Sequence, residues 1–262
     1  MVPDIDTSGR DGARIVSTER PLQRGFPLRS LSTRKAMACV VVGFAALLSL
    51  GSHRLAAQTA DIPASATDLA LIAAAGKGDL DAVAKAMRAG GSIKARDAQG
   101  RNAVLAATYG NHIPVALLLM AAGSDVNAKD SQENSAFLLA GAEGYLDILK
   151  LTLRSGADVN STNRYGGTAL IPAAHHGHLE AVRELLKTSV PINHVNKLGW
   201  TALLEAIILG DGGPRHTEIV RALVAAKADV GIADKDGVTP LAHAKRRGFA
   251  EMVKTLEGAG AK

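Results

Sequence analysis

One pattern of residues returns every 33 positions through most of this chain, and a repeat of that length restricts the fold more than any other feature. Its fullest copy runs from Gly166 to Leu186 and reads GGTALIPAAHHGHLEAVRELL, and altered copies lie on both sides of it. A long internal period indicates an architecture in which one small structural unit is stacked on the next. The polar residues that open successive copies are spaced by 33 three times and then by 38, and they are Asp97, Asp130, Asn163, Asn196 and Asp234.

Each copy predicts a first helix that begins at a small polar residue. Thr168, Thr201 and Thr239 stand at this place, and a threonine hydroxyl there can accept a hydrogen bond from an unpaired backbone N–H of the first turn. Pro240 follows the last of them, and proline is tolerated in the first turn because it has no N–H to lose. The copies at 102–104 and 135–137 degrade the pattern to Asn-Ala-Val and Ser-Ala-Phe.

Small and apolar residues then predict how the helices pack. The pair Ala173-Ala174 is small enough for neighbouring first helices to approach closely, and a glycine near the helix end supplies the left-handed backbone that closes it. Because no unit can bury its apolar face alone, stacking makes the core continuous. The closing glycines are Gly144, Gly177 and Gly248, and the apolar pairs expected to face the core are Leu119-Met120, Leu185-Leu186 and Leu223-Val224.

This pattern resembles the ankyrin repeat, whose signature is a 33-residue period with Thr-Pro-Leu-His-x-Ala at the start of the first helix. Thr239-Pro240-Leu241 comes nearest to that signature, and the Gly-Ala-Asp-Val-Asn segment at 156–160 has counterparts at 123–127 and 228–230. The resemblance covers about Thr67 to Lys262. It implies an all-α fold, an ankyrin-repeat solenoid of about six helix-turn-helix units with short β-turn or hairpin fingers.

The expected organisation is a leader at 1–57, a linker at 58–66 and a repeat domain at 67–262. Five extra residues near Asp211–His216 are expected to lengthen the turn between two helices, where Glu205, Asp211, Arg215 and His216 are candidates to converge. A long turn of this kind is either a functional loop or a tolerated surface insertion. The expected repeats are 67–96 and 234–262, which act as caps, and between them 97–129, 130–162, 163–195 and 196–233.

The leader predicts export. Arg34 and Lys35 precede an apolar run at 36–50, which is shorter than the roughly 20 residues that a spanning helix needs. Leu55-Ala56-Ala57 then resembles a small-residue cleavage site. We therefore predict a signal peptide cleaved after Ala57, with Ala60 as a second site, and a periplasmic or secreted protein. An uncleaved interfacial anchor and a start at Met37 are the alternatives, and residues 1–33 are expected to be disordered.

The charge of the chain lies mainly in that leader. The net charge is +5, but residues 1–57 hold eight Lys/Arg against four Asp/Glu, which leaves 22 against 21 for the rest. The basic balance would otherwise suggest nucleic acid, so no nucleic-acid partner is expected, and membrane contact is expected only through an uncleaved leader. The single cysteine, Cys39, also excludes a disulfide or thiolate metal site from the rest of the chain.

The resemblance also implies where a partner binds, because in ankyrin proteins the turn tips and the concave face of the first helix commonly hold it. Aromatic residues and arginine dominate interface hot spots, so we expect a central patch on the repeats at 163–195 and 196–233. Trp200 has an alternative role, packing flat against its own hairpin. Carried over by position, the candidate partner-binding residues are Tyr109, Arg164, Tyr165, His175, His176, Lys197, Leu198, Trp200, Arg246 and Arg247.

Catalysis and metal binding are not predicted. The run His175-His176-Gly177-His178 could suggest a metal, but no carboxylate or cysteine lies at ligand spacing from it. There is no Ser/His/Asp order and no glycine-rich phosphate loop, and an open solenoid has no enclosed pocket. We therefore expect no cofactor and no enzymatic activity.

The sequence thus predicts a monomeric scaffold or adaptor that binds another protein in a concave groove. The resemblance implies two alternatives for its role. One is an immunity or inhibitor protein that neutralises a secreted toxin, and the other is support of a periplasmic oxidative-stress enzyme such as a catalase. Both are analogies at the level of the fold.

Overall fold

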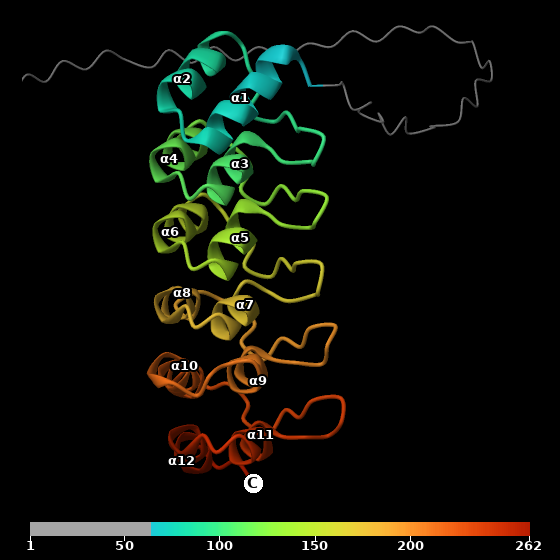
Figure 1. Cartoon of the computed structure of the whole chain (residues 1–262), viewed down its shortest axis with the longest axis vertical. Helices are drawn as coiled ribbons and strands as arrows, with labels where there is room; N and C mark the ends of the chain where they lie inside the picture. Colours follow the sequence, from blue (N-terminus) through green and yellow to red (C-terminus); the bar gives the residue numbers. More distant parts are fainter. Residues whose placement is uncertain (1–63) are drawn as a thin grey trace, which may run out of the picture. The chain divides into compact units, whose positions relative to one another are not determined.

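The computed structural model describes residues 64–262 (Figure 1). Their regular secondary structure is entirely α-helical, with no β-strand. The predictions for the leader, its cleavage site and the start of the linker fall outside the described residues. The all-α class is confirmed. The helices are α1 (Ala66–Lys77), α2 (Leu80–Arg88), α3 (Ala103–Tyr109), α4 (Ile113–Ala121), α5 (Ala136–Ala142), α6 (Leu146–Arg154), α7 (Leu170–His175), α8 (Leu179–Leu185), α9 (Ala202–Ile208), α10 (Pro214–Ala225), α11 (Pro240–Arg246) and α12 (Ala250–Gly258).

The described helices form two parallel columns. Each odd-numbered helix contacts the next odd-numbered one, each even-numbered helix contacts the next even-numbered one, and the two helices of each repeat contact each other. Figure 1 shows the loops between repeats projecting on the side of the odd-numbered column. The predicted solenoid of six helix-turn-helix units is confirmed, and the odd-numbered helices are its inner helices.

A continuous apolar core runs between the two columns. Leu119, Leu185 and Leu223 have no exposed surface, as the paired-leucine pattern predicts, and Ala173 and Ala174 are equally buried. Burial of apolar side chains is the dominant favourable contribution to the free energy of folding. This core is built from aliphatic residues with a single phenylalanine, Phe137, among its fully buried large side chains.

The inner helices α5 and α7 approach each other closely at Gly141. A Cβ atom added to Gly141 would lie 2.8 Å from the Cβ of Ala169, closer than two carbon atoms can pack. The backbone of Gly141 is not in the left-handed region, so space, and not conformation, requires glycine here.

Threonine caps two of the three helices for which it was predicted. The Oγ1 atoms of Thr201 and Thr239 accept from the backbone N–H three residues later, and Asn102 and Ser135 do the same. Thr168 does not, and the expectation was wrong there: α7 begins at Leu170, and Thr168 Oγ1 is buried without a partner.

Pro172 gives the reason for the missing cap. In the other repeats the carbonyl of the capping residue accepts from the N–H four residues on, as Thr201 does from Glu205. Proline has no N–H, so the carbonyl of Thr168 bonds the N–H of Ile171 instead, at 3.2 Å. That N–H is the one that would otherwise reach the hydroxyl.

The fingers between repeats are built on their first residue. In each of the five, one side-chain oxygen of the opening Asp or Asn accepts from the backbone N–H groups two and four residues later, an Asx turn. The tip then closes at a residue with positive φ, which is Gly100, Gly166, Gly199 or Gly237 in four fingers and Glu133 (φ 59°) in the fifth. The ten bonds involve Asp97, Asp130, Asn163, Asn196 and Asp234.

The insertion lengthens a helix as well as a turn. The turn at 209–213 has five residues where those at 110–112 and 143–145 have three, and α10 has 12 residues where α4 and α6 have nine. His216, one turn inside α10, lies against Gly177 as His178 lies against Gly144. The longer helix therefore supplies the imidazole that the regular repeat places at its helix start.

Only two of the four residues expected to converge at the insertion do so. His216 Nδ1 lies 2.8 Å from Asp211 Oδ1, and its Nε2 lies 2.8 Å from the carbonyl oxygen of His175. Arg215 lines a separate hollow with His178, and Glu205 points to the inner side of the stack. Arg215 and His216 are successive residues of α10, which turns their side chains to different faces, and Glu205 lies on α9.

Candidate functional site

A groove of about 520 Å³ runs along the inner helices and finger bases of the central repeats. It begins at the finger and helix of the repeat at 130–162 and ends on α9. One residue from the preceding repeat, Tyr109, reaches into it. Its lining comprises Tyr109, Asn134, Leu139, Ala142, Glu143, Asn163, Arg164, Tyr165, Gly167, Ile171, Pro172, His175, His176, Asn196, Leu198, Glu205 and Leu209.

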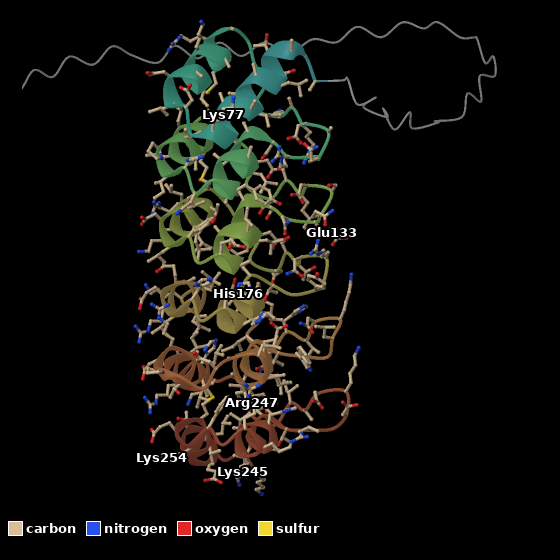
Figure 2. All side chains as sticks on the ribbon, viewed as in Figure 1. Lys77, Glu133, His176, Lys245, Arg247 and Lys254 are labelled. Atoms are coloured by element: carbon tan, nitrogen blue, oxygen red, sulfur yellow. The ribbon has the colours of Figure 1, made fainter. Side chains whose placement is uncertain are left out.

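The structure brings six of the ten predicted binding residues together in this groove. They come from different elements. One is the last residue of α7 and one is its C-cap residue, three lie at finger tips, and one lies at the end of α3. His176, which Figure 2 labels, is the C-cap residue of α7. The six are Tyr109, Arg164, Tyr165, His175, His176 and Leu198.

Large apolar side chains are exposed along this groove. Tyr165 is 52% exposed and Leu198 is 49% exposed, and Tyr109 and Leu209 are exposed to a similar degree. These are four of the eight large hydrophobic residues exposed in the described part of the chain. Apolar surface gathered in one concave place indicates a binding surface, whereas scattered exposed residues are ordinary.

The four remaining predicted residues lie elsewhere. Lys197 is exposed, and its Nζ donates to the carbonyl of Arg164 at 2.8 Å, so it joins two fingers. Arg247 donates to the carbonyls of Ile208 and Gly210 with its guanidinium over Phe249. Trp200 is half-buried and outside the groove lining, and Arg246 is exposed on the last inner helix.

Tyr109 and Arg164 hold neighbouring fingers in place at the groove edge. Tyr109 Oη donates to Asp130 Oδ2 at 2.7 Å and accepts from Asn134 Nδ2 at 3.0 Å. Arg164 donates to Gln132 Oε1 and lies over the ring of Tyr165, 4.8 Å from its centroid. The aromatic rings are therefore presented on fingers that are cross-braced, which lowers the entropy lost on binding.

Glu205 is a buried carboxylate in the groove wall. Its side chain is 8% exposed, and Oε1 accepts from Asn196 Nδ2 at 2.8 Å. His175 Nδ1 lies 3.7 Å from Oε2, which is beyond hydrogen-bond distance. Burial raises the pKa of Glu205, and the bond from Asn196 and the charge of His176 oppose that shift.

The histidines of the groove are held by the stack. His176 Nδ1 lies 2.8 Å from the carbonyl oxygen of Ala142 in the preceding repeat. Burial lowers the pKa of His175, and the charges of His176 and His216 lower it further. Within residues 64–262 no three His, Cys, Asp or Glu side chains gather in an arrangement that could hold a metal ion.

Several lining residues were missed in the sequence. The predicted residues His175 and His176 directly precede Gly177, and the equivalent residues before Gly144, Ala142 and Glu143, also line the groove. Leu209 precedes Gly210 in the same way, but the five-residue insertion makes the end of this helix hard to place from the sequence. Glu205 was considered only for the insertion, and no local signal places it opposite Asn196, because the two meet only when the finger folds back.

Known proteins resemble this chain over most of its length. A family model described as ankyrin repeats (3 copies) matches residues 137–232. The ankyrin repeat domain from Acinetobacter baumannii AYE is 53% identical with a TM-score of 0.72, and the match covers 73% of this chain and 98% of that domain. The ankyrin repeat protein EF0377 is 35% identical with a TM-score of 0.70, covering 72% and 97%.

Two further matches are more limited. The ankyrin repeat domain of Bcl-3, a member of the IkappaB protein family, is 26% identical with a TM-score of 0.66, and the match covers 74% of this chain and 86% of that domain. The ankyrin repeat protein YahD of Escherichia coli K12 is 46% identical over 57 residues, which span 22% of this chain and 28% of YahD.

Proposed function

This chain belongs to the ankyrin-repeat family, and we propose that its domain is a non-catalytic scaffold or adaptor that holds a segment of another protein in the central groove. Ankyrin repeats are protein–protein interaction modules. The proposal adds the place of contact, on the inner side of the repeats between 130 and 209. The residues that carry binding are the exposed rings and leucines presented there.

The single observation that carries this proposal is the gathering of exposed Tyr109, Tyr165, Leu198 and Leu209 along one groove. Tyrosine buries a large area at a modest cost in side-chain entropy, which is why aromatic residues are enriched at hot spots. The fingers that present them are fixed by hydrogen bonds between repeats. Neighbouring fingers are also joined directly, as by the bond from the N–H of Lys197 to the carbonyl of Tyr165.

The test is affinity capture with the C-terminally tagged full chain from its native host, followed by measurement of affinity for the captured partner. Tyr165→Ala and Leu198→Ala should each weaken that affinity by about 30-fold, since a hot-spot side chain contributes about 2 kcal/mol. Leu117→Ala is the matched control, because Leu117 is 50% exposed on an outer helix. Equal affinity of all three variants would contradict the groove as the binding surface.

We also propose that the domain works as a monomer outside the cytoplasm, periplasmic or secreted. The basic pair Arg34 and Lys35, the apolar run at 36–50 and the small residues at 55–57 support this. Mass spectrometry of the protein from fractionated cells should find an N-terminus at Gln58, or at Asp61 if the second site is used. In residues 64–262 none of the helices is long and apolar enough to cross a membrane.

The captured partner also decides the role of the scaffold. A secreted toxin whose activity falls when the complex forms would assign an immunity function, and an oxidative-stress enzyme that gains stability would assign a supporting one. Light scattering of the purified protein should give the mass of a single chain, and addition of nucleic acid should not change it. The near balance of 22 basic and 21 acidic residues after position 57 supports that last expectation.

A further inference from the structure

We infer that the groove recognises a cationic side chain, a lysine or an arginine, on the bound segment, and that the carboxylate of Glu205 receives it. The inference rests on the proposed function, because it names the partner chemistry of the same groove. The occupant is a partner polypeptide segment with one cationic side chain flanked by apolar ones.

Burial of Glu205 without a full set of partners is the first argument. Its side chain is more than nine-tenths buried, and in the described part of the chain its only hydrogen bond is the one from Asn196 to Oε1. Oε2 belongs to a residue that lines the groove, and no residue in the described part of the chain donates a hydrogen bond to it, since His175 Nδ1 lies 3.7 Å away. A buried carboxylate raises the free energy of the folded chain unless it is paired. A donor on a segment bound in the groove would supply the hydrogen bond that Oε2 lacks.

The charges around Glu205 favour a cation over any other donor. Glu143 adds a second carboxylate to the groove lining. Arg164, the only Lys or Arg in that lining, lies on Tyr165 and donates to Gln132. Burial lowers the pKa of His175, which favours its neutral form.

Arg247 belongs to the next repeat, and its guanidinium donates to the backbone carbonyls of Ile208 and Gly210. Within residues 64–262 no lysine or arginine pairs with Glu205, and His175 Nδ1 lies 3.7 Å from its Oε2.

The walls of the groove fit the rest of such a segment. Leu198 on its finger and Leu209 at the end of α9 line the same groove as the carboxylate, and Ile171 and Pro172 lie on α7. They provide apolar contact for the aliphatic stem of lysine or arginine, which packs on apolar surface while its charged end reaches a partner.

The experiment compares four nine-residue peptides with a central arginine, lysine, citrulline or glutamate between two leucines. Binding to the purified full chain is measured by ligand-observed NMR titration. A charge-assisted hydrogen bond contributes about 1.5 kcal/mol or more, so the arginine and lysine peptides should bind about tenfold more tightly than citrulline. Citrulline keeps the shape of arginine without its charge, and the glutamate peptide should bind most weakly.

Glu205→Gln should remove the preference for the cationic peptides and leave the citrulline affinity unchanged. Its side-chain oxygen can still accept from Asn196, so the finger keeps its hydrogen bond. Glu143→Gln, a change of the same kind at an exposed position of the same groove, should lower the preference far less, because solvent screens an exposed charge. Equal binding of the arginine and citrulline peptides, absence of binding by all four, or a preference that survives Glu205→Gln would overturn the inference.

The captured partner separates this inference from the proposed function. Release by Tyr165→Ala together with full retention by Glu205→Gln would leave the groove as the binding surface and refute the role of the carboxylate. Retention by Tyr165→Ala would refute the groove itself.

Discussion

Asn196 Nδ2 donates to Glu205 Oε1 at 2.8 Å, and this bond joins the first residue of a finger to the inner helix of the same repeat. The equivalent position in the next repeat, Asp234, uses its second oxygen to bind His243 at 2.7 Å. In both repeats, one side-chain atom of the opening residue accepts hydrogen bonds within the finger, and the other bonds to a side chain of the inner helix. Burial of a carboxylate in that wall lowers the stability of the folded chain because the charge loses its contact with water, and this effect can be measured.

Glu205→Gln should raise the melting temperature of the domain at pH 7. Burial raises the pKa of Glu205 above its ordinary value of 4.5, so ionisation is less favourable in the folded chain than in the unfolded chain. Removing that charge while keeping the bond from Asn196 should add about 1 kcal/mol, or about 2–4 °C in a domain of this size. Thermal unfolding followed by circular dichroism measures it.

The pH dependence of the difference has a definite sign. Between pH 4.5 and the raised pKa the folded chain holds a proton that the unfolded chain has lost, so the wild type loses stability as the pH rises through that interval. Glutamine does not titrate. The advantage of the variant should therefore vanish well below pH 4.5 and grow towards neutrality, and a constant difference across pH would refute this account.

Glu133→Gly should stabilise the domain by about 0.5–1 kcal/mol. Glu133 has φ 59° at the finger tip, where the other four fingers have glycine at the same place, and a side chain in the left-handed region costs about 1 kcal/mol or more. Ser131→Gly is the control on the same finger. Its φ is not positive, so glycine there should only increase the entropy of the unfolded chain and lower stability. Urea unfolding of both variants should show opposite signs.

The regular parts of the stack could be predicted because the same short sequence pattern forms the same helices and turns in each repeat. The period gave the inner and outer helices, and the leucine and alanine pairs identified buried positions such as Leu185 and Ala174. The finger openings at Asp97 and its equivalents follow from side-chain hydrogen bonds to the nearest N–H groups, which depend only on a short stretch of sequence.

The site was less predictable, because it is made by contacts between repeats. Six candidate residues meet in the groove, but Arg247 and Lys197 are used to hold neighbouring elements together, and only the stack shows which carbonyls they reach. Glu205 lies at a position that holds Pro172 in the repeat before and His243 in the repeat after. Its burial depends on the side chains of the adjacent repeat and on the finger, so the 33-residue pattern carries no signal for it.

Thr168→Val should stabilise the domain by about 1 kcal/mol, whereas Thr201→Val should destabilise it by about the same amount. Thr168 Oγ1 is buried without a partner, so the hydroxyl costs free energy, while Thr201 Oγ1 accepts from Leu204 N and caps α9. The cause assigned to Pro172 has its own test. In a Pro172→Ala background the cap on α7 should form, and Thr168→Val should then be destabilising.

Gly141→Ala should destabilise the domain by about 1–3 kcal/mol, although alanine is the better helix former. The added methyl would lie 2.8 Å from Ala169 Cβ, and neither backbone can move without parting α5 from α7. Gly76→Ala is the matched control in α1, where the nearest atom would lie at 3.8 Å and alanine should be neutral or stabilising. The double variant Gly141→Ala, Ala169→Gly removes the colliding methyl and should recover most of the loss in urea unfolding. If it recovers none, the contact between these helices does not limit the stack.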